Sequence, residues 1–99
     1  MLKLERRRSK IEVIADILRL GEASKTGIMY TANLSHYQLR EYLTFLVRRK
    51  LLDSVIAGNG AITYRVTPKG HRLLRDINIV LGMLRMSEPD DLGKHRQVT

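Results

Sequence analysis

The feature that most restricts the fold is the stretch YTANLSHYQ at residues 30–38, which separates two segments of helical character. Asn33 and Ser35 favour helix ends over helix interiors, because their short polar side chains bond neighbouring backbone groups and compete with the helical ladder. Asn is also one of the few residues that adopt a positive φ at little cost. The sequence therefore predicts that one helix ends near Asn33 and that the next begins at Ser35, across a very short turn.

The segment after this turn, residues 35–50, is predicted to be a helix with one packed face and one free face. Ser35 and Gln38 have the spacing of a capping box, in which each side chain bonds the backbone N–H of the other residue. At about 100° per residue, the apolar positions fall in one arc and the polar positions lie opposite. The apolar arc holds Leu39, Tyr42, Leu43 and Leu46, and the polar side holds His36, Tyr37, Arg40, Glu41, Thr44 and Arg48.

Two shorter helices are predicted before the turn. The first begins after Ser9, with Glu12 completing a capping box, and ends at Gly21. The second begins after Ser24. The packing positions expected on the first helix are Ile11, Ile14, Ala15 and Leu18, widened by Val13, Ile17 and Leu20, and those on the second are Ile28, Met29 and Ala32.

The hydrophobic period changes after residue 50. Two β-branched runs within LLDSVIAGNGAITYRVT flank Gly58, Asn59 and Gly60, which predicts a β-hairpin with a glycine-rich loop. Thr67 then caps a last helix with Pro68 in its first position. This helix can run to about Met86, or around 28 Å, and residues 87–99 have the composition of a flexible tail.

Charge indicates the class of partner. The chain of 99 residues fits a single domain and carries a net charge of +8, with a pI near 10.3, so polyanions are the expected partners. Five basic residues and one acidic residue within the first ten account for half of that charge. Residues 1–8 are therefore expected to form a basic arm. The arm is either a solvated tail or a segment that lies along phosphates.

Several other functions are not expected from this composition. No apolar run approaches the roughly 18 residues of a membrane span, and no signal-peptide core follows the basic start, so a soluble intracellular protein is predicted. With no cysteine, disulfides and thiol chemistry are excluded. His36, His71 and His95 have no metal-binding spacing. Since no phosphate loop, activated nucleophile or carboxylate pair appears, we expect no enzyme activity, no cofactor and no small-molecule ligand.

The order helix, helix, turn, helix, hairpin is that of a winged helix-turn-helix, a mainly α fold with a small β-hairpin (α+β), whose third helix enters the major groove. The motifs GIMYTANLSHYQLREYLTFLVRRKLL and YRVTPKGHRLL closely resemble small, basic archaeal winged-helix DNA-binding proteins that dimerise through a C-terminal antiparallel coiled coil. The resemblance covers about residues 9–84. It implies duplex DNA binding by residues 9–67 and a homodimer formed through residues 68–86. The last helix is shorter than the long helix typical of those proteins.

Candidate DNA contacts follow from exposure and charge on these elements. Tyr37 and His36 begin the third helix, and Arg40 and Thr44 continue its free side. Gln38 is equally suited to base contact and to capping Ser35, whereas Arg48 and its basic neighbours are explained by the helix dipole alone. The full predicted set is Ser35, His36, Tyr37, Gln38, Arg40 and Thr44, with Asn59 and Arg65 from the hairpin and Arg6, Arg7, Arg8 and Lys10 from the arm. Tyr30, Tyr42 and Tyr64 are expected to be core or rim residues.

The dimer prediction depends on the last helix. Its apolar stripe is wider than one small domain is expected to cover, and comprises Leu73, Leu74, Ile77, Val80, Leu81 and Leu84. The alternative is packing within one chain, with Leu73, Leu74 and Ile77 buried on the first helix. Function is left open between a transcriptional regulator and a chromatin-like architectural protein of the nucleoid. The alternative to a DNA-binding function is that of a protein-interaction adaptor.

Overall fold

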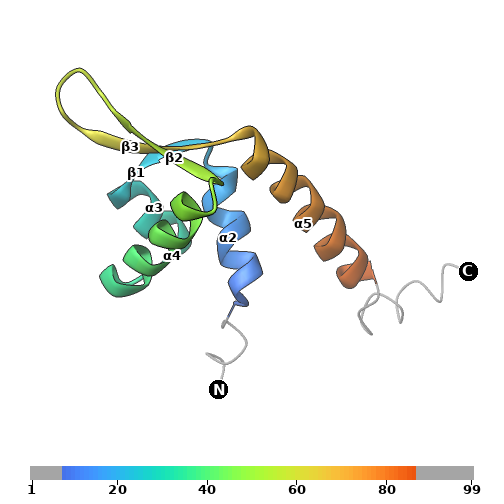
Figure 1. The fold of residues 1–99 in the computed structure, drawn as a ribbon. Coiled ribbons are helices and arrows are strands. Elements are labelled where there is room, and N and C mark those ends of the chain that lie inside the picture. The colour runs from blue at the N-terminus through green and yellow to red at the C-terminus, as the bar shows by residue number, and fades with distance from the viewer. Residues whose placement is uncertain (1–7, 87–99) are drawn as a thin grey trace, which may run out of the picture.

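The computed structural model describes residues 8–86, which form four α-helices and a three-stranded antiparallel sheet. The elements are α2 (Lys10–Arg19), β1 (Glu22–Ser24), α3 (Lys25–Ala32), α4 (His36–Arg48), β2 (Leu52–Ile56), β3 (Ile62–Val66) and α5 (Pro68–Met86). The β2–β3 hairpin projects from the helices, and α5 begins beside α2 and diverges from it toward its C-terminal end (Figure 1). The predicted winged helix-turn-helix fold with a C-terminal helix is confirmed.

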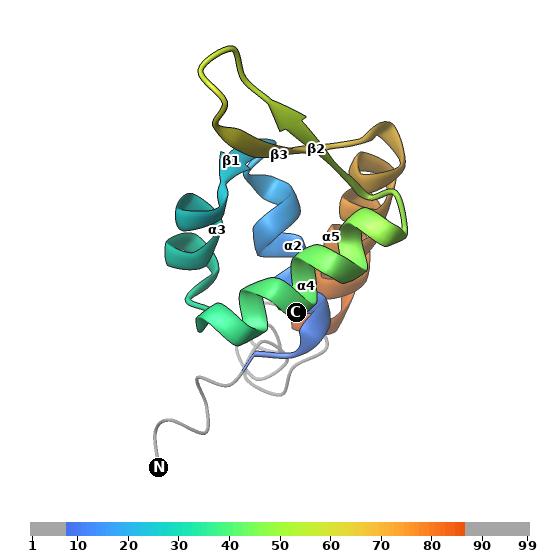
Figure 2. The same ribbon diagram turned by 60° about the vertical axis from the view of Figure 1, so that its left-hand side comes forward.

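The predicted helix ends are confirmed in detail. Ser9 and Glu12 form a capping box at α2, and Ser35 and Gln38 form one at α4. Asn33 ends α3 in the left-handed conformation, with φ 55° and ψ 56°. The break between α3 and α4 is therefore produced by local side-chain chemistry, and it allows α4 to cross the other helices (Figure 2).

Strand β1 was not predicted from the sequence. It pairs with β3, so that the strand order is β1-β3-β2 and β3 is central. Three residues reading Glu-Ala-Ser carry no alternating apolar pattern, and the strand forms because Gly21, with φ 78°, directs the chain alongside β3. The Gly21 carbonyl accepts a hydrogen bond from the Val66 amide at 2.8 Å, which extends this pairing by one residue.

The core lies between the helices and the base of the sheet. Its most deeply buried large side chains are Ile17, Leu18, Ile28, Leu46 and Leu52. Two expectations are wrong. Ile11 is 50% exposed rather than packed, and Tyr30 is 77% exposed on α3 rather than part of the core or its rim.

Helix α5 is attached by its first half. Thr67 accepts a hydrogen bond from the Gly70 amide, and a Cβ at Gly70 would lie 2.3 Å from the Leu51 carbonyl oxygen, so only glycine permits this approach. Ile77 is buried, and Leu73 and Leu74 pack against the core cluster. Val80 and Leu84 are 49% and 58% exposed.

A series of polar contacts joins the helices on the side of α2. Arg8 donates to the Asp16 carboxylate and to the Ala32 carbonyl at the end of α3. Asp16 also accepts from Arg19 at 2.8 Å, and Arg19 in turn donates to Asn78 of α5 at 3.1 Å. Arg8, the last residue of the predicted arm, is therefore bonded to the helical domain. Arg6 and Arg7 lie outside the described residues.

Candidate nucleic-acid interface

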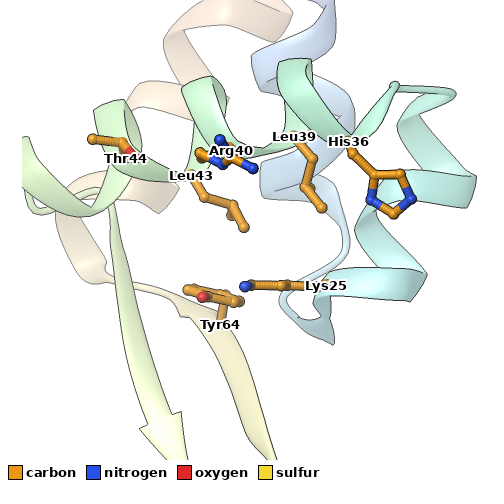
Figure 3. A pocket seen from close by; sticks show the side chains of 7 residues that line it. All are labelled: Lys25, His36, Leu39, Arg40, Leu43, Thr44 and Tyr64. Carbon is orange, nitrogen blue, oxygen red and sulfur yellow. The ribbon is translucent and has the colours of Figure 1, made fainter.

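The free side of α4 contains a hollow of about 220 Å³ between this helix, the start of α3 and the sheet. Leu39 and Leu43 form its apolar floor, and we call the polar residues around it the basic cup. The basic cup consists of Lys25, His36, Arg40, Thr44 and Tyr64. Figure 3 shows Lys25 extending toward the Tyr64 ring, opposite the side chains of α4. Lys25 and Arg40 form no ion pair within residues 8–86, so their charges are available to an anion.

Local sequence explains how the basic cup is assembled. His36, Arg40 and Thr44 are four residues apart, so they lie on one side of α4. Ser24 caps α3 by accepting from the Gly27 amide at 3.1 Å, which places Lys25 in the first helical position. Lys25 and Tyr64 were not predicted as site residues. Lys25 could have been predicted as a site residue, because it directly follows the helix cap Ser24. Tyr64 could not, because its place in the site depends on where β3 lies in three dimensions.

The other predicted residues of α4 line a second hollow, toward α2. Tyr37 and Gln38 line an open groove of about 450 Å³ between α4 and α2, together with Lys10, Ile14, Glu41, Tyr42 and Phe45. Gln38 Oε1 accepts from the Ser35 amide at 2.9 Å, and Ser35 Oγ accepts from the Gln38 amide at 3.1 Å. Both capping oxygens are therefore occupied. Tyr37 is 66% exposed and is the largest free side chain at the start of α4.

The two predicted hairpin residues differ in their surroundings. Asn59 lies in the exposed loop at the hairpin tip. Arg65 lies beside Glu22 on one neighbouring strand and beside Asp53 on the other, and its Nε is 3.3 Å from Glu22 Oε1. The hydrogen bond from the Thr63 hydroxyl and the bond from Arg65 lower the pKa of Glu22. Because side chains alternate along a strand, Arg65 faces away from Tyr64 and from the basic cup.

Other classes of site find little support in the described part of the chain. No group of three or more His, Asp or Glu side chains within residues 8–86 could hold a metal ion. His36 and His71 lie on different helices, and His95 lies outside the described residues. Among the helices that the structure describes, none has the length and apolar character needed to cross a membrane.

Comparison with known proteins agrees with this geometry. A family model described as winged helix-turn-helix matches residues 7–85. The chain belongs to the winged helix-turn-helix family. This winged helix-turn-helix chain is 36% identical over 81 residues to an uncharacterized protein of Methanocaldococcus jannaschii. The match covers 79% of the chain and 36% of that protein, so the chain spans little more than a third of its relative's length.

Solved structures share the winged helix-turn-helix fold. The chain resembles Sso10a-2, a DNA-binding protein from Sulfolobus solfataricus, with a TM-score of 0.73, 24% identity and coverage of 92% of this chain and 96% of that one. It also resembles the transcriptional regulator BldR from Sulfolobus solfataricus, with a TM-score of 0.70, 16% identity and coverage of 87% and 68%. The PcaV transcriptional regulator from Streptomyces coelicolor gives a TM-score of 0.69 at 19% identity, with coverage of 95% and 72%.

Proposed function

We propose that this protein binds duplex DNA through the free side of α4, without enzymatic activity. The observation that carries the proposal is the basic cup, where Lys25 and Arg40 have no ion-pair partner among residues 8–86 and lie next to and on the third helix of a winged helix-turn-helix fold. Cations in such a position neutralise phosphates and release counterions, which is the main source of affinity for DNA. Arg40 and Tyr37 are then placed to reach base edges in the major groove.

The similar structures support the same class of partner. One is a DNA-binding protein and two others are transcriptional regulators. Ser35 and Gln38 fit a secondary role, because their capping oxygens are already bonded. His36 and Thr44 flank Arg40 in the basic cup, and Lys10 borders the groove next to Tyr37. We expect Arg6 and Arg7 of the arm to add phosphate contacts.

We further propose that the protein is a homodimer joined through α5. Residues 9–67 would then bind DNA, residues 68–86 would join the two copies, and residues 87–99 would form a tail. Support comes from the exposed apolar side chains in the second half of α5, namely Ile79, Val80, Met83 and Leu84. Leu73, Leu74 and Ile77 serve the protein's own core, so Val80, Leu81 and Leu84 are the part of the predicted stripe that a partner would cover.

The biological role divides into two cases with different physical requirements. A transcriptional regulator needs a preferred site and a large specificity ratio, whereas a chromatin-like architectural protein relies mainly on phosphate contacts. Either role places the protein on the nucleoid. Mapping of genome-wide occupancy separates the two, because discrete peaks indicate a regulator and broad coverage indicates an architectural protein.

Binding to duplex DNA as a function of salt tests the proposal directly. If some 4 to 8 phosphates are neutralised, the logarithm of the affinity should fall against the logarithm of salt concentration with a slope of roughly −4 to −7. Deleting residues 1–7 should make the slope shallower while leaving Arg8 in place. An affinity that does not change with salt would contradict DNA binding and would favour the adaptor function.

A further inference from the structure

The groove between α2 and α4 contains most of the aromatic side chains of the protein. The sequence has four tyrosines, one phenylalanine and no tryptophan, and Tyr37, Tyr42 and Phe45 line this groove of about 450 Å³. Tyr42 packs against the core and belongs to the floor, whereas Tyr37 and Phe45 are 66% and 40% exposed. Ligand pockets have volumes of roughly 300–1,000 Å³, so the groove is large enough to hold a planar ring.

Helical spacing explains why two exposed rings and a carboxylate share one side of α4. Tyr37, Glu41 and Phe45 are four residues apart, so each lies about 6 Å further along the helix axis than the one before. The Arg49 guanidinium carbon is 5.0 Å from the centroid of the Phe45 ring, and this cation–π contact helps to orient the ring. The α4 side of the groove therefore has a ring at each end and a carboxylate between them.

Three polar side chains of the groove have hydrogen-bonding capacity left for a partner. Gln38 Oε1 accepts from the Ser35 amide at 2.9 Å, so the Gln38 side chain offers mainly its Nε2 donors. Neither Lys10 nor Glu41 forms an ion pair with another residue in the range 8–86. The groove thus combines ring faces with an amide donor, a carboxylate acceptor and an ammonium group. Rings of this kind stack on nucleobases, polar groups bond the base edge, and cations bind the phosphate.

We propose that this groove binds an unpaired DNA base that carries an amino group, so that the protein prefers duplexes with a base outside the stack. This inference rests on the proposed binding of duplex DNA by α4, because Tyr37 lines the groove and is also expected to meet the duplex. A paired base is covered by its neighbours in the stack and its Watson–Crick edge is occupied. Only an unpaired base can therefore use the rings, Gln38 and Glu41 together. Cytosine, adenine and guanine offer an amino donor to Glu41, whereas thymine has no amino group.

Duplexes with one extra unpaired nucleotide test this inference. Three bulged duplexes of the same sequence carry deoxycytidine, thymidine or an abasic residue at the bulge, and a fully paired duplex is the reference. The deoxycytidine bulge should bind about tenfold more tightly than the abasic bulge, which interrupts the duplex in the same place but offers no base to stack. The thymidine bulge should fall between them, because thymine stacks but gives Glu41 no amino group.

Two variants assign the preference to the groove. Phe45→Leu keeps an apolar side chain but removes the ring, and should reduce the advantage of the deoxycytidine bulge over the abasic bulge to less than about threefold. Glu41→Ala should make the deoxycytidine and thymidine bulges equal within about twofold. Both effects are ratios between duplexes, so a general change in protein charge cancels. Val47→Ala is the control and should leave both ratios unchanged, since Val47 is an exposed apolar residue of α4 outside the groove lining.

Three outcomes overturn the inference without affecting duplex binding by α4. Equal binding of the abasic and deoxycytidine bulges shows that no base enters the groove. A base preference that survives in Phe45→Leu places the base elsewhere. Free 5′-deoxycytidine monophosphate distinguishes a base in DNA from a free nucleotide: if the wild type binds it while all bulged duplexes bind alike, the groove is a nucleotide site and not a DNA contact. Absence of salt-dependent binding to the paired duplex would instead contradict the proposed function itself.

Discussion

Helices α4 and α5 both leave part of their surface uncovered, but the uncovered parts differ in chemistry. On α4 the free side carries His36, Arg40 and Thr44, and it borders a hollow that also contains Lys25. On α5 the uncovered surface is in the second half, where Val80 and Leu84 are about half exposed. Water solvates the first surface well and the second poorly. The first therefore suits a charged polymer, whereas the second suits an apolar partner such as another copy of α5.

The contrast arises from where each helix meets the core. Helix α4 packs along its full length through Leu39, Leu43 and Leu46, so that its outer side is free to carry polar residues. Helix α5 is held at one end, by the close approach at Gly70 and by burial of Ile77. Beyond Ile77 the apolar stripe continues with Val80 and Leu84, which stay about half exposed among residues 8–86. Exposed apolar side chains of this kind mark interaction sites, so they support the proposed dimer.

The largest effect is expected from charge placed on the second half of α5. Val80→Glu with Leu84→Glu should convert a dimer into a folded monomer, and should weaken binding to a two-site duplex by about 100-fold through loss of the linked second contact. Sedimentation equilibrium and DNA titration measure the two effects. Arg75→Glu is the control, because it changes the net charge by the same amount at an exposed position of α5. A wild-type monomer of 11.4 kDa at tens of micromolar would refute the dimer.

The next largest effect concerns the free side of α4. Arg40→Ala or Tyr37→Ala should weaken binding by about 1–3 kcal/mol and narrow the difference between the best site and a random one. Lys25→Ala should weaken binding to all sequences alike and reduce the salt slope by about 1. Arg72→Ala on α5 removes the same charge far from the basic cup and serves as the control. If Tyr37→Ala and Arg40→Ala fold normally and bind as the wild type does, α4 is not the recognition helix.

Each half of α5 contains one glycine, and the two glycines have different surroundings. Gly70→Ala should destabilise the protein by about 1–3 kcal/mol, because the new methyl group overlaps the Leu51 carbonyl. Gly82→Ala has open space around it and should instead stabilise the helix by about 0.5–1 kcal/mol. Urea unfolding at matched protein concentration measures both. Equal effects of the two substitutions would show that the first turn of α5 does not pack against Leu51.

The smallest effect is expected on the outer face of the sheet. The lowered pKa of Glu22 means that its carboxylate stabilises the fold above its ordinary pKa of 4.5, and that this contribution is lost as the pH falls through the lowered value. Glu22→Gln should therefore cost slight stability at neutral pH and none in strong acid. Arg65→Ala should weaken DNA binding less than Arg40→Ala, since Glu22 and Asp53 flank Arg65. A loss as large as that of Arg40→Ala would make Arg65 a main phosphate contact.

Local chemistry made most of the fold predictable from sequence. Capping at Ser9, Ser24 and Ser35 and the left-handed Asn33 depend on neighbours within four residues, so their patterns are visible in the chain itself. Strand β1 depends on pairing with residues some 40 positions away, and no local pattern marks it. The candidate site could likewise be predicted only where it depends on residues close together in the sequence. The side of α4 that carries Arg40 could be predicted, but the proximity of Lys25 and Tyr64 depends on how α3 and β3 pack.

One series of polar contacts bears on the relative positions of the helices. It consists of the hydrogen bonds of Arg8, Asp16, Arg19 and Asn78. They connect the end of α3, just before the turn into α4, with the middle of α5. In a dimer joined through α5, any rotation of that helix about α2 would have to break the bond from Arg19 to Asn78. These contacts would therefore help to fix the position of α4 relative to α5 within each subunit of such a dimer. Such a dimer would distinguish DNA sites by the number of base pairs between their halves, in steps of one helical turn of about 34 Å.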